Sequence, residues 1–250
     1  WRLFWQRNDV EIAGDRENQQ GVRYCLFQLH SAYRGLRPTD NIGAKGLTGE
    51  AYNGHAFWDT ETYCLPFYLF SDPKAAKALL LYRYHTLPKA VERARELDLR
   101  GACYPIATLD GTEACTLWQH SSLQPQPTTA VAYAVETYCE MTGDEEFLSR
   151  EGAEMLCQIA RYLISRGGWN EAGFGFYGVM GPDEFHMMVS NDFYTNFMGK
   201  KALSYAARVL KARPQAAARL GVDREEWEAW EYAAEHILLP RRADGAFDPH

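Results

Sequence analysis

Helix signals recur along this chain while strand signals are rare, and this contrast restricts the fold more than any other feature. Asp72-Pro73 supplies an N-cap and a first-turn proline for a helix that we expect to run towards Glu96, with Pro88 dividing it. The segment Thr142–Glu145 has the pattern of a capping box, and it opens a helix that we expect to end at Gly167. Such start and stop signals predict a helical protein.

Apolar residues at helical spacing extend this interpretation to the rest of the chain. We expect further helices over roughly 17–34, 58–70, 127–141 and 192–211, and one that starts at Asp223. Strands are expected only at Leu3–Trp5 and Phe174–Val179, and no strand is followed by a glycine-rich nucleotide motif. The sequence therefore predicts an all-α fold with about seven or eight helices.

Composition excludes several classes of partner. The 250 residues are 46% hydrophobic, enough for one large core, and carry a net charge of −7, which argues against nucleic acid. No run of about eighteen apolar residues is present, so we expect no membrane span. The chain opens at Trp1 without a recognisable leader, and its six cysteines are widely spaced. We interpret them as buried thiols in a reducing compartment and expect a cytoplasmic protein.

Three long connections rich in glycine and proline interrupt the helices, over 35–57, 101–127 and 167–191. Loops of this length are uncommon unless they carry function. We therefore expect the functional residues in and beside these three segments.

The first connection leads into Trp58, Asp59 and Glu61 at a predicted helix start. An aromatic ring beside two carboxylates offers a stacking surface and acceptors for sugar hydroxyl groups. The alternative is that Asp59 or Thr60 only caps the helix. The local pattern does not decide between the two.

The third connection contains Glu184, placed after the rigid turn Gly181-Pro182 and among apolar or aromatic neighbours. Apolar surroundings favour the protonated form of a glutamate, which is the form that a general acid needs. A solvated carboxylate or a helix cap is the more common reading of such a residue. The middle connection combines Trp118, Gln119 and His120, a composition suited to a neutral polyol.

Four segments in order along the chain resemble glycoside hydrolase family 65, which includes maltose, trehalose, kojibiose and nigerose phosphorylases. They are the spaced residues Trp5–Gln20, then Asn41–Leu47 (NIGAKGL), Gly54–Glu61 (GHAFWDTE) and Gly178–Phe185 (GVMGPDEF). The resemblance extends from Trp5 to about Ala207, and the ordered set is far more specific than any one member.

The resemblance implies that residues 1–250 form part of a single (α/α)6-barrel catalytic domain, without the family's N-terminal β-sandwich and the C-terminal portion of the barrel. It implies that Glu184 is the catalytic acid, that Trp58 and Asp59 hold the donor glucosyl unit, and that Trp118, Gln119 and His120 lie on the acceptor side. The implied reaction is inverting phosphorolysis of an α-linked glucosyl disaccharide, with inorganic phosphate as co-substrate and no cofactor or metal. For the full-length protein we expect a homodimer.

Two departures leave alternatives open. The family's phosphate-binding residues lie downstream of His250, so a trehalase-like hydrolase remains a second reading and a non-catalytic carbohydrate-binding module a third. The stretch Ser121–Thr129 lacks the histidine that many members carry there, so the acceptor sugar is not assigned.

Overall fold

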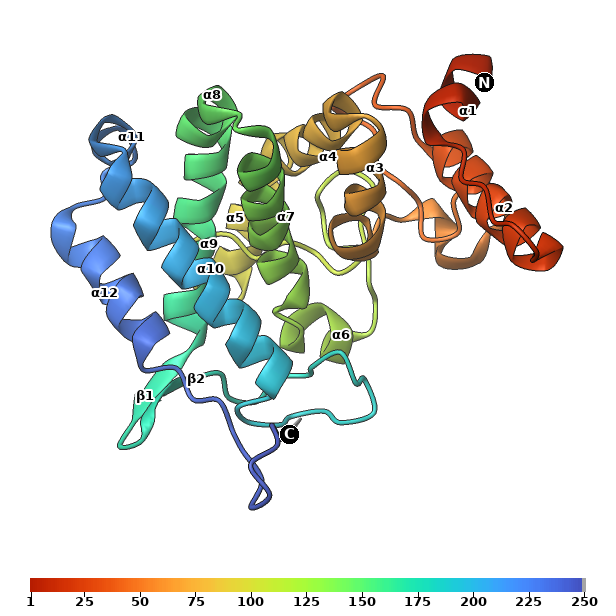
Figure 1. The fold of residues 1–250 in the computed structure, drawn as a ribbon. Coiled ribbons are helices and arrows are strands. Elements are labelled where there is room, and N and C mark those ends of the chain that lie inside the picture. Colours follow the sequence, from red (N-terminus) through yellow and green to blue (C-terminus); the bar gives the residue numbers. More distant parts are fainter. Residues whose placement is uncertain (249–250) are drawn as a thin grey trace.

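The structure is a computed structural model that describes residues 1–248, and it is an all-α fold (Figure 1). The described residues form twelve α-helices: α1 Arg2–Asn8, α2 Arg16–Ala32, α3 Leu65–Ser71, α4 Pro73–His85, α5 Leu87–Glu96, α6 Trp118–Leu123, α7 Gln126–Thr142, α8 Glu145–Phe147, α9 Ala153–Arg166, α10 Phe193–Ala212, α11 Pro214–Leu220 and α12 Arg224–Glu235. Short π-helical turns precede α3 (Thr60–Cys64) and α9 (Leu148–Gly152), and a 3-10 turn covers Ala51–Gly54. The strands β1 (Gly168–Asn170) and β2 (Gly173–Gly175) pair as one antiparallel hairpin.

The larger helices form two rows. Helices α3, α7 and α10 contact one another in sequence order and form the inner row, and each also packs against a helix of the outer row, α4, α9 or α12. Figure 1 shows α7 and α10 rising from the lower side of the view, where the loops before them lie. Trp58, just before the turn that leads into α3, has its ring centroid 6.1 Å from that of Tyr194 in the first turn of α10. Segments that precede inner helices therefore meet at one end of the fold.

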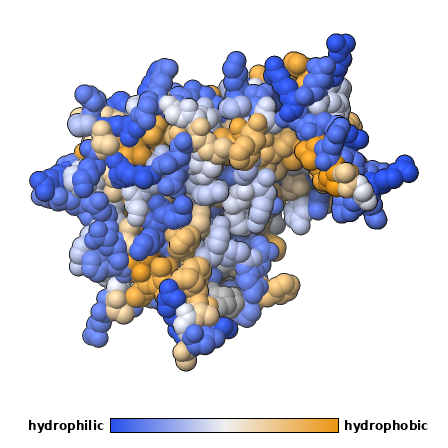
Figure 2. All heavy atoms as spheres, in the orientation of Figure 1, coloured by the Kyte–Doolittle hydropathy of each residue, from blue (hydrophilic) through white to orange (hydrophobic). Residues whose placement is uncertain are grey.

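One continuous core lies between the two rows. It is built from small side chains that let helices approach closely, such as Ala160 and Ala206, and from large buried ones, such as Tyr162 and Trp230. Fully burying a large apolar side chain is worth about 1.5–3 kcal/mol, so this shared core holds the rows together. The face shown in Figure 2 is mostly hydrophilic with separate hydrophobic areas, and Phe70 of α3 remains 81% exposed.

The predicted helix boundaries are largely confirmed. The division near Pro88 is present, because α4 ends at His85 and α5 begins at Leu87. Asp223 caps α12 by accepting a hydrogen bond from the Glu226 N–H at 2.8 Å.

Three predictions are wrong. The described residues form twelve α-helices instead of seven or eight, because α1, α6, α8 and α11 are too short to show a helical period in the sequence. The capping residue after α7 is Asp144, which accepts from the Phe147 N–H at 3.1 Å, whereas Thr142 is the last residue of α7. Leu3–Trp5 is helical within α1 and pairs with no strand. The helix is held against α2, because the Phe4 ring stacks on the His30 ring with their centroids 3.9 Å apart. The other predicted strand is confirmed in part, since β2 covers Gly173–Gly175.

The six cysteines are free thiols, as predicted, but only Cys103, Cys139 and Cys157 are buried. Cys25 is exposed, because α2 has few neighbours beyond α1 in this structure and buries none of its residues. Every helix within residues 1–248 is too short or too polar to span a membrane.

Candidate active site

The loop that carries Glu184 is anchored at both ends. Val179 and Val189 form an antiparallel bridge across its base, and Asp192 ends it by capping α10 through the Thr195 N–H at 2.7 Å. Gly181 is required within it, because a Cβ atom there would meet the carboxylate of Asp192 at 2.5 Å. The loop is therefore tied to the start of an inner helix.

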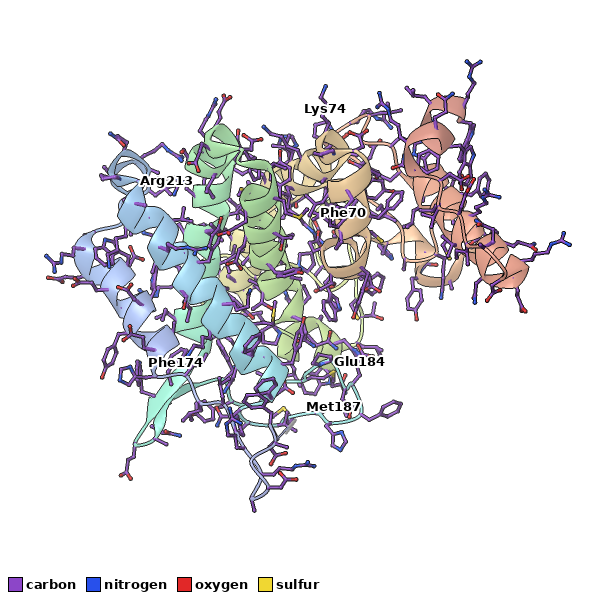
Figure 3. All side chains as sticks on the ribbon, viewed as in Figure 1. Phe70, Lys74, Phe174, Glu184, Met187 and Arg213 are labelled. Carbon is purple, nitrogen blue, oxygen red and sulfur yellow. The ribbon has the colours of Figure 1, made fainter. Side chains whose placement is uncertain are left out.

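Glu184 lies against α6, as Figure 3 shows. Its Oε1 atom accepts a hydrogen bond from Gln124 Nε2 at 3.0 Å and lies 3.3 Å from His120 Nδ1. The backbone supports this approach, since the Met180 N–H donates to the Leu123 carbonyl at 2.9 Å. Among the described residues Oε2 has no hydrogen-bond partner, so only one of the two carboxyl oxygens is held.

The amide of Gln124 also orients the histidine. Its Nε2 atom lies 3.1 Å from His120 Nδ1 and 3.0 Å from the sulfur of Met180. Since an amide nitrogen only donates, Nδ1 accepts this bond, and the proton of the neutral ring is then on Nε2 with the amide oriented as in the structure.

The apolar enclosure expected for Glu184 is not observed. Its side chain is 54% exposed, and the adjacent Phe185 is 95% exposed. Of its apolar neighbours in sequence only Val179 and Met180 are buried, because they lie at the base of the loop while Glu184 lies at its outer end.

Trp58 and Asp59 come directly before the π-helical turn that leads into α3. The Trp58 ring is half-buried, with its centroid 6.1 Å from that of Tyr194 on α10. Asp59 is exposed and borders a hollow of about 340 Å³ that the glycine-rich connection also lines. It occupies the N-cap position without a capping hydrogen bond, so the reading of Asp59 as a mere cap is wrong.

Glu61 does not serve as a second acceptor for sugar hydroxyl groups. Its side chain is 1% exposed and forms an ion pair with Arg83 of α4 at 2.7 Å. The sequence interpretation that grouped both carboxylates with Trp58 is therefore wrong for Glu61, since π-helical winding turns it into the protein interior.

The middle connection supplies His120 to the site, together with Gln124, which sequence reasoning missed. Trp118 begins α6 and is 59% exposed, and Gln119 is half-buried. Within residues 1–248 no hydrogen bond or ring contact joins the Trp58–Asp59 pair to Glu184. Both groups nevertheless precede inner helices, and so they lie at the same end of the fold (Figure 1).

Two rows of paired helices, with a carboxyl group and aromatic side chains in the loops at one end, define an all-α domain with a candidate site where the inner helices begin. The chain belongs to glycosyl hydrolase family 65, since the model of that family's central catalytic domain matches residues 23–248.

Curated relatives agree with this family. The chain is 37% identical to the maltose phosphorylase of Bacillus subtilis, over 96% of this chain and 32% of the relative. It is 41% identical to the α,α-trehalose phosphorylase of Geobacillus stearothermophilus, over 95% of this chain and 32% of the relative. The chain thus spans about a third of the length of these relatives.

A solved structure shares the fold. A human-microbiome protein provisionally named a kojibiose phosphorylase matches 99% of this chain and 34% of its own, with a TM-score of 0.93 and 47% identity. The three relatives differ in the disaccharide that their names give, so they support a shared type of reaction more than a shared substrate.

Proposed function

We propose that the protein containing this chain carries out inverting phosphorolysis of an α-linked glucosyl disaccharide. The observation that carries the proposal is Glu184, held by Gln124 through one oxygen and adjacent to His120, in a chain whose named relatives are disaccharide phosphorylases. In this proposal residues 1–250 contribute to a single barrel domain.

The proposed reaction is a single displacement. Glu184 donates its proton to the glycosidic oxygen, the bond between that oxygen and the anomeric carbon breaks, and its electron pair stays on the oxygen. A phosphate oxygen forms a bond to the anomeric carbon from the opposite face, which inverts the configuration and gives β-glucose 1-phosphate and the free acceptor sugar. Phosphate is the nucleophile and Glu184 supplies the proton, so this scheme uses no cofactor.

The remaining site residues are assigned to the two sides of the glycosidic bond. Trp58 stacks on the glucosyl unit and Asp59 accepts its hydroxyl groups, while Trp118, Gln119 and His120 lie on the acceptor side. The contact between His120 and Glu184 supports this placement, because the acid must lie between donor and acceptor. An inverting hydrolase would need a second carboxylate to activate water.

The test uses the complete gene product that contains this chain. A panel of α-linked glucobioses is incubated with and without phosphate, and glucose and glucose 1-phosphate are measured separately. Glucose 1-phosphate of the β configuration, formed only with phosphate, is the expected result. Glucose release without phosphate would instead show a hydrolase, and no turnover under either condition would indicate a binding module.

Glu184→Gln tests the acid directly. A general acid contributes about 10²–10⁴-fold, so the rate of phosphorolysis should fall by that order. The loss should be much smaller with 4-nitrophenyl α-glucoside, whose leaving group needs little protonation. The matched control is Glu171→Gln in the exposed turn between β1 and β2, which should leave the rate unchanged. Near-normal activity of Glu184→Gln on disaccharides would remove Glu184 from the role.

A further inference from the structure

Arg83 and Glu61 form a fully buried ion pair beside the candidate donor residues. Their side chains are 0% and 1% exposed. The contact is two-pronged: Arg83 Nε donates to Glu61 Oε1 at 2.7 Å, and Arg83 Nη2 donates to Glu61 Oε2 at 2.8 Å. This fork fixes both the distance and the orientation of the two groups.

The same guanidinium also bonds to the backbone on the N-terminal side of Trp58 and Asp59. Arg83 Nη2 also donates to the Phe57 carbonyl in a long bond of 3.4 Å. Phe57 and Glu61 bracket the Trp58–Asp59 pair in sequence, and Arg83 itself lies within α4, a helix of the outer row. Arg83, a side chain of the outer row, is therefore bonded to both ends of the segment that contains Trp58 and Asp59.

The backbone conformation of this segment explains why the bonds of Arg83 affect the position of Trp58 and Asp59. Residues Thr60–Cys64 form a π-helical turn, a winding that is rare and occurs frequently at functional sites. The Thr60 hydroxyl donates to Asn41 Oδ1 at 3.1 Å, which links the turn to the glycine-rich connection. The position of Trp58 and Asp59 thus depends on side-chain bonds as well as on regular helix geometry.

The stability of the fold alone does not explain why two charged side chains are buried at this position. Burying two charges costs several kcal/mol, and well-packed apolar side chains of similar volume are often as stable or more so. Arg83 Nη1 is, in addition, buried without a hydrogen-bond partner among the described residues. The presence of a charged pair here therefore indicates that the pair fixes the position of the neighbouring segment.

We propose that Arg83 and Glu61 are positioning residues that hold Trp58 and Asp59 in the donor subsite. The inference rests on the proposed function for the meaning of that subsite. Trp58 contacts Tyr194 of α10, the helix that follows the Glu184 loop, so a shift of the segment also changes its relation to that loop. A displacement of about 1 Å in a substrate-positioning group can lower the rate by about 10²-fold.

The experiment replaces both charges at once in the complete gene product, as Arg83→Met with Glu61→Met, because removing one partner alone leaves a buried unpaired charge. A matched control exists between α9 and α12, where Arg161 donates to Glu226 with the same fork at 2.7 and 2.9 Å. Arg161→Met with Glu226→Met removes a pair that has the same fork, is 25% and 29% exposed, and makes no hydrogen bond to the candidate site residues.

Three measurements separate positioning from simple stabilisation: the thermal midpoint, hydrogen exchange of residues 57–64, and steady-state kinetics. We expect a midpoint close to that of the wild type, faster exchange over 57–64, and a fall of about 10- to 100-fold in kcat/KM for the glucoside with an unchanged KM for phosphate. The control pair should leave exchange over 57–64 and kcat/KM as in the wild type.

Unchanged exchange over 57–64 together with unchanged kcat/KM would overturn the positioning role. If the wild type forms no glucose 1-phosphate, the proposed function fails, while the exchange measurement still decides whether the pair holds the segment. If the double variant does not fold, Arg83→Lys, which keeps the charge and loses the fork, gives the same readouts. Wild-type exchange and kinetics in that variant would count equally against the proposal.

Discussion

Replacing Gln124 with leucine should lower activity without lowering stability. The Gln124 side chain is 6% exposed, and its Nε2 atom donates to Glu184 Oε1 at 3.0 Å. The buried Oε1 atom of Gln124, by contrast, has no hydrogen-bond partner within the described part of the chain. The substitution therefore removes the bond that orients the proposed acid, the bond to His120 Nδ1, and an unsatisfied polar atom.

The two effects have opposite signs. A neutral hydrogen bond contributes about 0.5–1.5 kcal/mol net, which corresponds to about a two- to tenfold lower kcat/KM if the bond is present in the transition state. An unsatisfied buried polar atom costs about 1–3 kcal/mol, and leucine of similar volume would fill the space beside Met180. We therefore expect the free energy of unfolding of Gln124→Leu to be unchanged or higher.

The assay is glucose 1-phosphate formation at saturating phosphate, combined with urea unfolding of the same preparations. Gln126→Leu is the matched control, because Gln126 is also buried and its Oε1 atom also has no partner among the described residues, yet it makes no bond to Glu184. Only Gln124→Leu should lose activity. Equal kcat/KM for both variants, or a loss of stability in Gln124→Leu that accounts for its lower rate, would refute the reasoning.

Two further predictions concern the scaffold. Gly101→Ala should lower the free energy of unfolding by about 3 kcal/mol, because Gly101 has a φ of +78° and a Cβ atom would lie 2.1 Å from the backbone oxygen of Gln158; an unchanged urea midpoint would contradict this. The pKa of Asp144 is lowered from its ordinary value of 3.8. Burial alone would raise this pKa, but hydrogen bonds to the carboxylate, first of all from Lys77, outweigh the effect of burial. The ionised carboxylate therefore stabilises the fold above the unfolded pKa and ceases to do so as the pH falls through the folded pKa. Asp144→Asn should lower the thermal midpoint at pH 7, with a difference that shrinks below pH 3.8, and a pH-independent difference would argue against this linkage.

The helices could be predicted from sequence because their signals are local. An N-cap such as Asp223 acts on an N–H three residues away, and Pro88 disrupts only its own turn. Where two local signals competed, as at Thr142 and Asp144, the pattern did not show which side chain reaches the free N–H. Leu3–Trp5 was mistaken for a strand because its helical form depends on aromatic contacts with α2.

The site could be predicted only in part, for a different physical reason. Glu184, Trp58 and Asp59 were predicted from motifs, but the partners that hold Glu184 and the segment of Trp58 and Asp59 are distant in sequence. Arg83 lies 22 residues from Glu61, and Gln124 lies 60 residues from Glu184. Neither pairing leaves a periodic or capping signal.

The arrangement of the rows explains why distant segments meet nevertheless. Each inner helix is followed by a return through the outer row, so the next inner helix starts again at the same end of the fold (Figure 1). The connections before α3, α7 and α10 consequently carry Trp58, Gln124 and Glu184 to that end. Alternation of rows thus specifies which loops share a site, whereas direct side-chain bonds, from Gln124 to Glu184 and from Arg83 to Glu61, specify the distances on which the proposed chemistry depends.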